Sequence, residues 1–271
     1  MLVADFRRWT VNALFQGLRW YTRRSPFHRG RGAFIRPIEM LKRRGWPPPL
    51  LGIGCGMTME FEPSLLGWTL LEHGEWEPAQ TALILNLLSR DAVVLNVGAN
   101  TGYYALLAAA AVGPGGSVHA FEIQPAMIQI LTRNVMRNGL QKIVRIVETG
   151  CFSAPGEAVI EEHGDPGSAR IRFAGTGLRV PLITIDHYVR AAALGRVDLL
   201  IIDTEGADFE ILKGAAGVLE RFHPVVMAEA HHLAEFGGSE EEMIEFMSRF
   251  GYSARPMLNE FSRDLLFLPS R

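Results

Sequence analysis

The stretch Ala92-Val-Val-Leu-Asn-Val-Gly-Ala-Asn-Thr-Gly-Tyr-Tyr-Ala105 decides the fold, because an apolar run leads through a turn into a second apolar run. The first run predicts a buried strand over 92–97, and the second predicts a helix over 102–111. Gly98 and Gly102 stand on either side of the turn, where glycine lets a backbone approach a ligand closely. The stretch therefore predicts a ligand-binding junction between a strand and a helix, although a tight turn without a ligand remains the alternative.

Two common nucleotide-binding motifs are excluded at this turn. The dinucleotide fingerprint G-x-G-x-x-G requires glycine at the positions that Asn100 and Tyr103 occupy. A phosphate loop of the form G-x-x-x-x-G-K-[ST] requires a Gly-Lys pair, and none follows here. The turn is thus neither of these phosphate-binding loops.

Strands and helices alternate along most of the chain. Further strands are predicted over 57–61 at a sheet edge, 117–121, 143–147, 197–202 and 225–230, with a hairpin-like pair at 158–162 and 169–173 and a terminal pair at 252–256 and 265–268. Helices are predicted over 78–88, 125–138, 207–219 and 240–250. This alternation indicates βαβ units in a mostly parallel sheet, whose ligand binds beyond the carboxyl ends of the strands.

Acidic residues stand at three of these predicted strand ends. Glu122 follows the second strand, 24 residues after Gly98, near the spacing of about 20 at which a carboxylate accepts ribose hydroxyls. The alternative is an acid that interacts favourably with the dipole of the following helix. Asp203 and Glu205 follow the fourth strand, where capping of the next helix by Asp203 or Thr204 is the alternative to a site role.

The fifth strand carries Glu229 among apolar neighbours, and His231 and His232 follow it. A buried acid is costly unless it is paired, so a site role is favoured for Glu229. One of the two histidines should face the cleft. Because the spacing of these ligand types is not that of a tight metal site, no metal is predicted.

The stretch 92–105 resembles motif I of the class I S-adenosylmethionine (SAM) methyltransferases, and more narrowly that of the FkbM family, named for a macrolide O-methyltransferase. The resemblance runs from about Met57 to the C-terminus. Three further segments carry it: Gly74-Glu-Trp-Glu-Pro78, Val118-His-Ala-Phe-Glu122, and Val197-Asp-Leu-Leu-Ile-Ile-Asp-Thr-Glu-Gly-Ala207 followed by Leu212-Lys-Gly214.

The resemblance implies an α/β fold of the Rossmann-like class I methyltransferase type. Its mostly parallel, twisted sheet would have the strand order 3-2-1-4-5-7-6, with helices on both faces and an N-terminal helical extension. It implies SAM as the cofactor and, as the reaction, methylation of a hydroxyl on a sugar, glycolipid or polyketide-like acceptor.

The same resemblance assigns roles to individual residues. The turn 98–102 would hold the amino-acid end of SAM, Glu122 the ribose, and residues around 148–152 the adenine. The implied cofactor-binding residues are Asn96, Gly98, Ala99, Asn100, Gly102, Tyr103, Glu122, Gly150 and Cys151. A general base should take the proton of the acceptor hydroxyl, and the candidates in order of preference are Asp203, Glu205, Glu229 and His231.

Three positions depart from the family pattern. Asn96 replaces the usual motif I acid, Ile123 and Gln124 separate Glu122 from the following proline, and Ile201 replaces a common lysine. Two other functions therefore stay open. A non-catalytic, membrane-associated protein on a degenerate methyltransferase fold is one, kept open by Asn96. An NAD(P)-binding oxidoreductase is the other, although the missing dinucleotide fingerprint argues against it.

Charge is unevenly distributed along the 271 residues. Residues 1–46 hold eleven Lys or Arg and two acids, whereas the remainder holds 16 Lys or Arg and 27 acids. An amphipathic helix is predicted over 2–22, with a broad apolar face that either docks on the protein's own core or lies on a membrane surface. Prolines 47–49 mark a boundary. We expect a basic helical extension over 1–46, a segment covering the substrate side over 47–90, and a SAM-binding core over 91–271.

Composition limits the cellular setting. Two cysteines, Cys55 and Cys151, are too few for a disulfide framework, which favours a cytoplasmic protein. No apolar run approaches the roughly 20 residues of a membrane span. Charged residues near the start of the chain interrupt the apolar region that a signal peptide requires. The expected partners are a small-molecule, glycan or lipid-linked acceptor and, through 1–46, the inner face of a membrane. No nucleic acid is expected.

Overall fold

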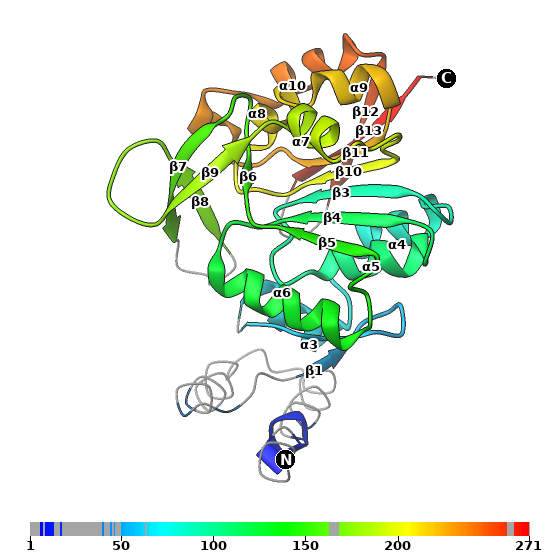
Figure 1. The fold of residues 1–271 in the computed structure, drawn as a ribbon, viewed down its shortest axis with the longest axis vertical. Helices are drawn as coiled ribbons and strands as arrows, with labels where there is room; N and C mark the ends of the chain where they lie inside the picture. The colour runs from blue at the N-terminus through cyan, green and yellow to red at the C-terminus, as the bar shows by residue number, and fades with distance from the viewer. Residues whose placement is uncertain are drawn as a thin grey trace.

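The computed structural model describes residues 50–62, 64–162, 168–258 and 263–270, together with residues 6–7, 9–13, 17, 40, 44 and 46 near the N-terminus. Its centre is a seven-stranded sheet with the order β12-β13-β11-β10-β3-β4-β5 (Figure 1). The strands are β3 (Val93–Val97), β4 (Ser117–Phe121), β5 (Val144–Val147), β10 (Leu199–Ile202), β11 (Val225–Glu229), β12 (Tyr252–Leu258) and β13 (Arg263–Pro269). Neighbouring strands from β5 to β11 pair in parallel, and β13 is antiparallel to both of its neighbours. The sheet therefore has the predicted order 3-2-1-4-5-7-6.

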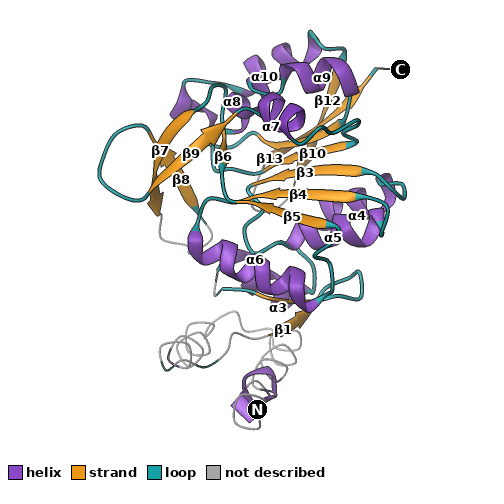
Figure 2. Cartoon of the chain, in the orientation of Figure 1, coloured by secondary structure: helices purple, strands orange, loops and turns teal. Residues whose placement is uncertain are grey.

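Successive side chains of each strand point to opposite faces of the sheet, so a continuous apolar strand makes both faces apolar. In β10, Leu199 and Ile201 pack in one core, whereas Leu200 and Ile202 pack in the other. Helices α4 (Pro78–Leu87), α5 (Tyr103–Val112) and α6 (Pro125–Arg137) cover the first face. Helices α7 (Ile185–Ala191), α8 (Asp208–Lys213), α9 (Ala216–Phe222) and α10 (Glu240–Ser248) cover the second (Figure 2).

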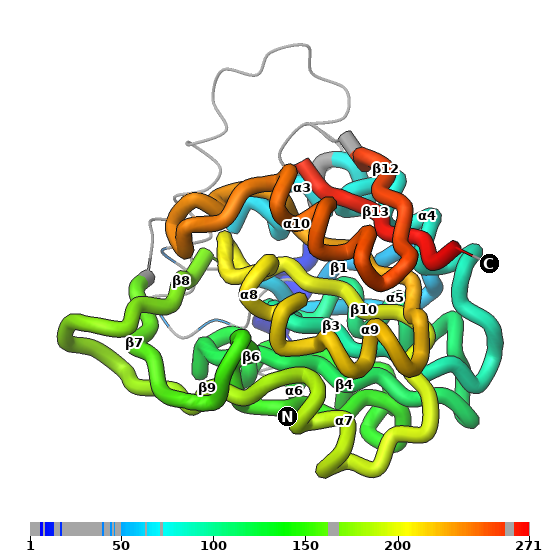
Figure 3. Tube along the Cα trace, turned by 90° about the horizontal axis from the view of Figure 1, so that it is seen from above, coloured from blue at the N-terminus to red at the C-terminus, as the bar shows by residue number. Residues whose placement is uncertain are grey.

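A second sheet of four strands lies to one side of the main sheet (Figures 1 and 3). Its order is β6-β9-β7-β8, with β6 (Gly150–Cys151), β7 (Gly156–Glu162), β8 (Ala169–Arg172) and β9 (Arg179–Ile183). The antiparallel pair β7–β8 confirms the predicted hairpin. Since β6 follows β5 after a short turn, this sheet stands beyond the carboxyl ends of the parallel strands.

Two predictions of local structure were wrong. The strand expected at 57–61 is not an edge of the main sheet, because β2 (Thr58–Glu60) pairs only with β1 (Leu50–Gly52) in a separate hairpin. The single helix expected at 207–219 is instead two helices, α8 and α9, with Gly214 between them. A Cβ atom on Gly214 would lie 2.2 Å from the backbone oxygen of Phe152, so close packing against β6 accounts for the glycine that separates the two helices.

Asn134 of α6 joins the β1–β2 hairpin to the turn after β3. Its Nδ2 donates to the backbone oxygens of Glu60 and Thr101, each at 2.8 Å, and its Oδ1 accepts from the Glu60 amide at 2.6 Å. Asn134 is fully buried. One side chain thus fixes the hairpin and the predicted cofactor turn to the same helix.

The substitution Asn134→Ala should lower the free energy of unfolding by about 3 kcal/mol, because it leaves three buried backbone groups unpaired. Asn138→Ala is the matched control, since Asn138 makes similar bonds to Thr58 where the backbone is exposed. Its expected cost is about 1 kcal/mol or less. Urea unfolding of both variants measures the difference, and equal losses would contradict this role of Asn134.

Among the described residues, no helix is long and apolar enough to cross a membrane. Of the helix predicted over 2–22, residues 6–7 and 9–13 are helical, and residue 17 is too. The rest of that prediction lies outside the described residues.

Candidate active site

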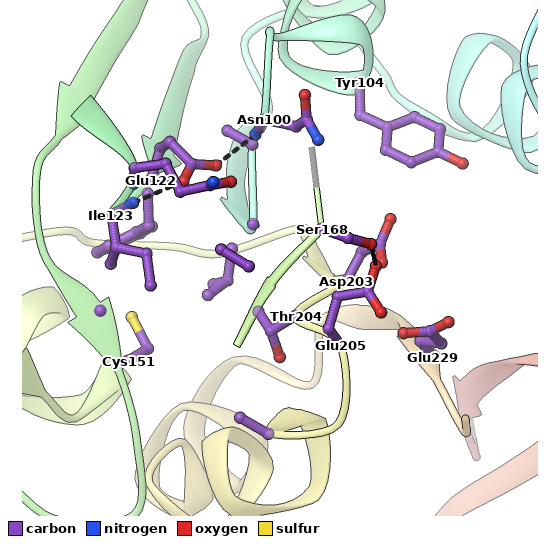
Figure 4. Close-up of a pocket in the computed structure, with 18 of the residues that line it drawn as sticks. Asn100, Tyr104, Glu122, Ile123, Cys151, Ser168, Asp203, Thr204, Glu205 and Glu229 are labelled. Carbon is purple, nitrogen blue, oxygen red and sulfur yellow. Dashed lines mark hydrogen bonds between the residues drawn. The ribbon is translucent and has the colours of Figure 1, made fainter. Parts of the chain in front are cut away.

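The carboxyl ends of β3, β4, β10 and β11 surround a cavity of about 320 Å³, and residues of the second sheet close its other side (Figure 4). A volume of this size suits a small-molecule ligand. Segment 64–77, which precedes the sheet, adds Ser64, Leu65, Leu66, Trp76 and Glu77 to the wall. It remains a prediction that the segment 47–90 covers the substrate side.

The turn after β3 is shaped by residues with positive φ angles. Gly98, Asn100 and Gly102 have φ values of 82°, 52° and 100°. A Cβ atom on Gly98 would lie 1.8 Å from the backbone oxygen of Asp203, so glycine lets the loop after β10 pack directly on this turn. Gly98 therefore serves the contact between two loops of the cavity, in addition to any contact with a ligand.

Glu122 is held at the end of β4 by three backbone hydrogen bonds. Its Oε2 accepts from the Asn100 amide at 2.7 Å, and its Oε1 accepts from the amides of Ile123 and Gln124 at 2.8 Å each. Burial raises the pKa of Glu122, while these hydrogen bonds lower it. A carboxylate oxygen has more than one lone pair, so Glu122 retains capacity to accept ligand hydroxyls.

After β5, the cavity is lined by Thr149 and by Gly150 and Cys151 of the short strand β6. A Cβ atom on Gly150 would lie 2.6 Å from Leu182 Cδ2, so glycine lets β9 pack closely here. Burial raises the pKa of the Cys151 thiol. A thiol of this kind does not act as a nucleophile at neutral pH.

Carboxyl side chains gather at the β10 and β11 end of the cavity (Figure 4). Burial raises the pKa of Asp203 well above its usual range, and the negative charge of Glu77 adds to this effect. Burial and then the charge of Asp203 raise the pKa of Glu229. Glu229 is 8% exposed, and its Oε2 has no hydrogen-bond partner among the described residues. Its Oε1 lies 4.0 Å from Nδ1 of His231.

Neither Asp203 nor Thr204 caps the helix that follows β10. Helix α8 has Ala207 at its N-cap position and no side-chain cap hydrogen bond, so the capping alternative was wrong. Thr204 instead donates to Asp208 Oδ2 at 2.8 Å. Glu205 has a positive φ angle of 57° and accepts from Ser168 Oγ at 2.5 Å. Such strained backbone is frequent at functional sites.

Several residues of the site were not predicted, among them Glu77, Tyr104 and Asp208. Glu77 lines the cavity with a positive φ angle of 42°, and it accepts a hydrogen bond from the Tyr104 hydroxyl. Asp208 is fully buried behind the cavity, where burial raises its pKa to about 7, and its Oδ1 accepts from the Glu229 amide at 3.2 Å. The signal for Glu77 was its place in the segment Gly74-Glu-Trp-Glu-Pro78.

All but two of the predicted site residues line the cavity, the exceptions being Asn96 and Gly102. Asn96 is fully buried within β3, and neither its Oδ1 nor its Nδ2 has a partner among the described residues. A Cβ atom on Gly102 would lie 2.5 Å from Leu131 Cδ1, so this glycine serves packing against α6. Within the described parts of the chain, no group of three or more His, Cys, Asp or Glu residues is placed to hold a metal ion.

The sheet order and a cavity at the strand ends define a Rossmann-like methyltransferase fold. A family model for the methyltransferase FkbM domain matches residues 96–254, and the chain belongs to this family. It is thus a methyltransferase, and the cofactor that the family implies is SAM.

Solved structures with similar folds share little sequence with the chain. The methyltransferase FkbM from Methylobacillus flagellatus is 14% identical with a TM-score of 0.49, and the match covers 67% of this chain and 45% of that one. The precorrin-6y C5,15-methyltransferase from Geobacter metallireducens is 17% identical with a TM-score of 0.43, and the match covers 71% of this chain and 87% of that one. An O-methyltransferase from Bacillus cereus in complex with SAH is 14% identical with a TM-score of 0.45, and the match covers 75% of this chain and 87% of that one. The chain thus spans less than half the length of the Methylobacillus protein, and no curated protein matches it.

Proposed function

We propose that this chain transfers the methyl group of SAM to a hydroxyl oxygen of a sugar, glycolipid or polyketide-like acceptor. The observation that carries the proposal is the position of Asp203. Its backbone contacts the turn at Gly98, and its side chain lines the same cavity as Glu122. A candidate base and a candidate cofactor site therefore share one enclosed space.

The residues at the β3, β4 and β5 ends fit SAM. The turn 98–102 would hold the amino-acid end, and Glu122 would accept hydrogen bonds from the ribose hydroxyls. Residues 149–151 would border the adenine. When bound, SAM supplies a methyl group already activated by a positively charged sulfur.

The β10 and β11 end supplies the base. As the new O–C bond forms and the S–C bond to the methyl group breaks, S-adenosylhomocysteine would leave, and the Asp203 carboxylate would take the proton of the acceptor hydroxyl and hold it on an oxygen. A raised pKa makes Asp203 a stronger base than an exposed aspartate. The protein also aligns the two reactants, which supports a displacement at carbon without any covalent protein intermediate.

The substitution Glu122→Ala should weaken SAM binding by about 1–3 kcal/mol, because ribose hydroxyls lose their acceptor and the Asn100 amide loses its anchor. Isothermal titration calorimetry measures the change. Glu220→Ala is the control, since Glu220 is exposed on α9 and lies outside the cavity wall. If Glu122→Ala binds SAM as tightly as the wild type does, the cofactor lies elsewhere.

The reaction itself is tested by incubating the protein with SAM labelled in its methyl group and with glycan, lipid and small-molecule extracts. A labelled product bearing a new methyl ether supports the proposal. Label on nitrogen, carbon or sulfur would contradict the choice of a hydroxyl acceptor, while a failure of SAM to bind would contradict the cofactor.

We also propose that the N-terminal extension contacts an anionic membrane surface. Phe6 and Trp9 are 63% and 66% exposed, and their rings stack with centroids 6.3 Å apart. Arg7 between them is exposed, whereas Asn12 accepts from the Leu50 amide at 2.9 Å. Exposed aromatic rings beside a basic residue suit the interface of a bilayer.

The double substitution Phe6→Ser with Trp9→Ser should abolish most binding to phosphatidylserine-containing vesicles at low salt, because both apolar anchors are lost. Co-sedimentation measures binding, and vesicles of phosphatidylcholine alone show how much depends on charge. SAM affinity should be unchanged by the substitution. A wild-type protein that ignores anionic vesicles would end the membrane proposal.

A further inference from the structure

Carboxyl groups outnumber basic side chains in the described wall of the cavity, where His231 is the basic residue. Five carboxyl side chains line the cavity, from Glu77, Glu122, Asp203, Glu205 and Glu229, and no Lys or Arg of the described residues does so. Residues 1–49, of which the structure describes only a part, hold eleven Lys or Arg. Among the described residues, a ligand that enters this cavity therefore meets five carboxyl groups and no Lys or Arg.

Among the described residues, Arg170 is the arginine that approaches this cluster, and it is already paired with acidic side chains. Arg170 of β8 forms an ion pair with Glu235, and its Nη2 lies 3.8 Å from Glu205 Oε2. The Arg170 side chain is 16% exposed and is not part of the cavity wall. Its Nη1 and Nη2 are directed to these two carboxylates, while its buried Nε has no hydrogen-bond partner among the described residues.

The hydrogen-bonding capacity that remains at the β10 and β11 end is mainly that of acceptors. The Tyr104 hydroxyl donates to Glu77, and the Ser168 hydroxyl donates to Glu205. Glu229 lines the cavity and is more than nine-tenths buried, and its buried Oε2 has no hydrogen-bond partner among the described residues. A buried polar atom without a partner is costly, and a ligand that donates a hydrogen bond would remove that cost.

Apolar side chains also line the cavity. Trp76 and Leu65 line it from the segment that precedes the sheet. Small-molecule sites commonly combine such apolar walls with a few placed polar groups. A polyol ring has both kinds of surface, with hydroxyl donors at its edge and C–H groups on its faces.

We propose that the acceptor presents a neutral or amino-substituted polyol to the carboxyl cluster of Glu77, Asp203, Glu205 and Glu229. Acceptors with a phosphate or carboxylate beside the reacting hydroxyl are excluded because the described wall of the cavity offers no Lys or Arg to pair with a ligand anion. This inference rests on the proposed function and narrows its substrate class, since it removes sugar phosphates and uronic acids.

Binding to the protein loaded with S-adenosylhomocysteine tests the inference without turnover. The probes are methyl glucoside, its 2-amino analogue, its 6-phosphate and the corresponding uronate, measured by saturation-transfer NMR and calorimetry at low salt. The neutral and amino probes should bind at least tenfold more tightly than the two anionic probes. Equal or tighter binding of the anionic probes would overturn the inference, and so would binding of none of the four.

The substitution Glu205→Lys tests the cause of this selectivity. Glu205 is partly exposed, so a lysine there should be tolerated, and it should increase affinity for the 6-phosphate probe at least tenfold. Glu220→Lys, on the exposed surface of α9, changes the net charge equally and should leave the order of the probes unchanged. A gain that is the same in both variants would overturn the role of the cluster. Failure of S-adenosylhomocysteine to bind the wild type would instead overturn the proposed function.

Discussion

The substitution Asp203→Asn should lower kcat by about 10²–10⁴-fold, the usual range for loss of a general base. The SAM dissociation constant should change only a few-fold. Asparagine keeps the shape of the side chain, and the backbone at 203 is fixed by the hydrogen bond that its N–H donates to the Val97 carbonyl oxygen and by its contact with Gly98. Single-turnover rates with labelled SAM measure the first quantity, and calorimetry measures the second.

The pH dependence distinguishes a base from a structural carboxylate. Because burial and Glu77 raise the pKa of Asp203, wild-type kcat should rise with pH through a value well above that of an ordinary aspartate. The Asp203→Asn variant should lack this rise. Glu205→Gln is the comparison variant and should lose less than about tenfold in kcat, because Glu205 is hydrogen-bonded to Ser168 at the rim. Near-normal turnover of Asp203→Asn would move the role of base to Glu229 with His231.

The strands of the parallel sheet could be predicted from the sequence because burial on both faces leaves continuous apolar runs. The strand β4 has the predicted bounds, 117–121, and β3 and β10 begin only one or two residues later than predicted. Elements stabilised by tertiary contacts were missed. Helix α3 (Leu65–His73) contains Gly67, where a Cβ atom would lie 2.2 Å from Phe61, so packing and not helix propensity selects that glycine. Strand β9 contains Pro181, which argues against a strand in sequence terms.

The site was predictable where topology alone brings residues together. Glu122, Asp203 and Glu229 stand at the carboxyl ends of β4, β10 and β11, which are parallel strands of one sheet, so their meeting at one edge follows from the sheet. Glu77 comes from a segment outside the sheet, and Tyr104 comes from the first turn of α5. The contact between Glu77 and Tyr104 depends on how α4 packs on α5, and this packing cannot be predicted from the residues at strand ends. The burial of Asn96 beneath the turn could likewise not be predicted from the sequence, because its position in the motif indicated a contact with the ligand.

The cluster also makes stability depend on pH, with Glu229 as the clearest contributor. Its pKa in the folded chain is raised by burial and by Asp203, so the folded state binds more protons than the unfolded state at neutral pH. The stability associated with the protonated group is therefore complete below the unfolded pKa, near 4.5. It is lost as pH rises toward the folded pKa.

The substitution Glu229→Gln should remove this dependence. Relative to the wild type, its free energy of unfolding should increase as pH rises from 5 to 8, by at most about 1.4 kcal/mol per pH unit. A total gain of about 2–4 kcal/mol is expected, because the amide carries no charge to repel Asp203. Urea unfolding across this pH range measures it, with Glu157→Gln, whose side chain is 67% exposed, as the control that should follow the wild type. If the curves for Glu229→Gln and wild type run parallel, Glu229 is not held protonated by its neighbours, and the carboxyl groups of the cavity do not act as one cluster.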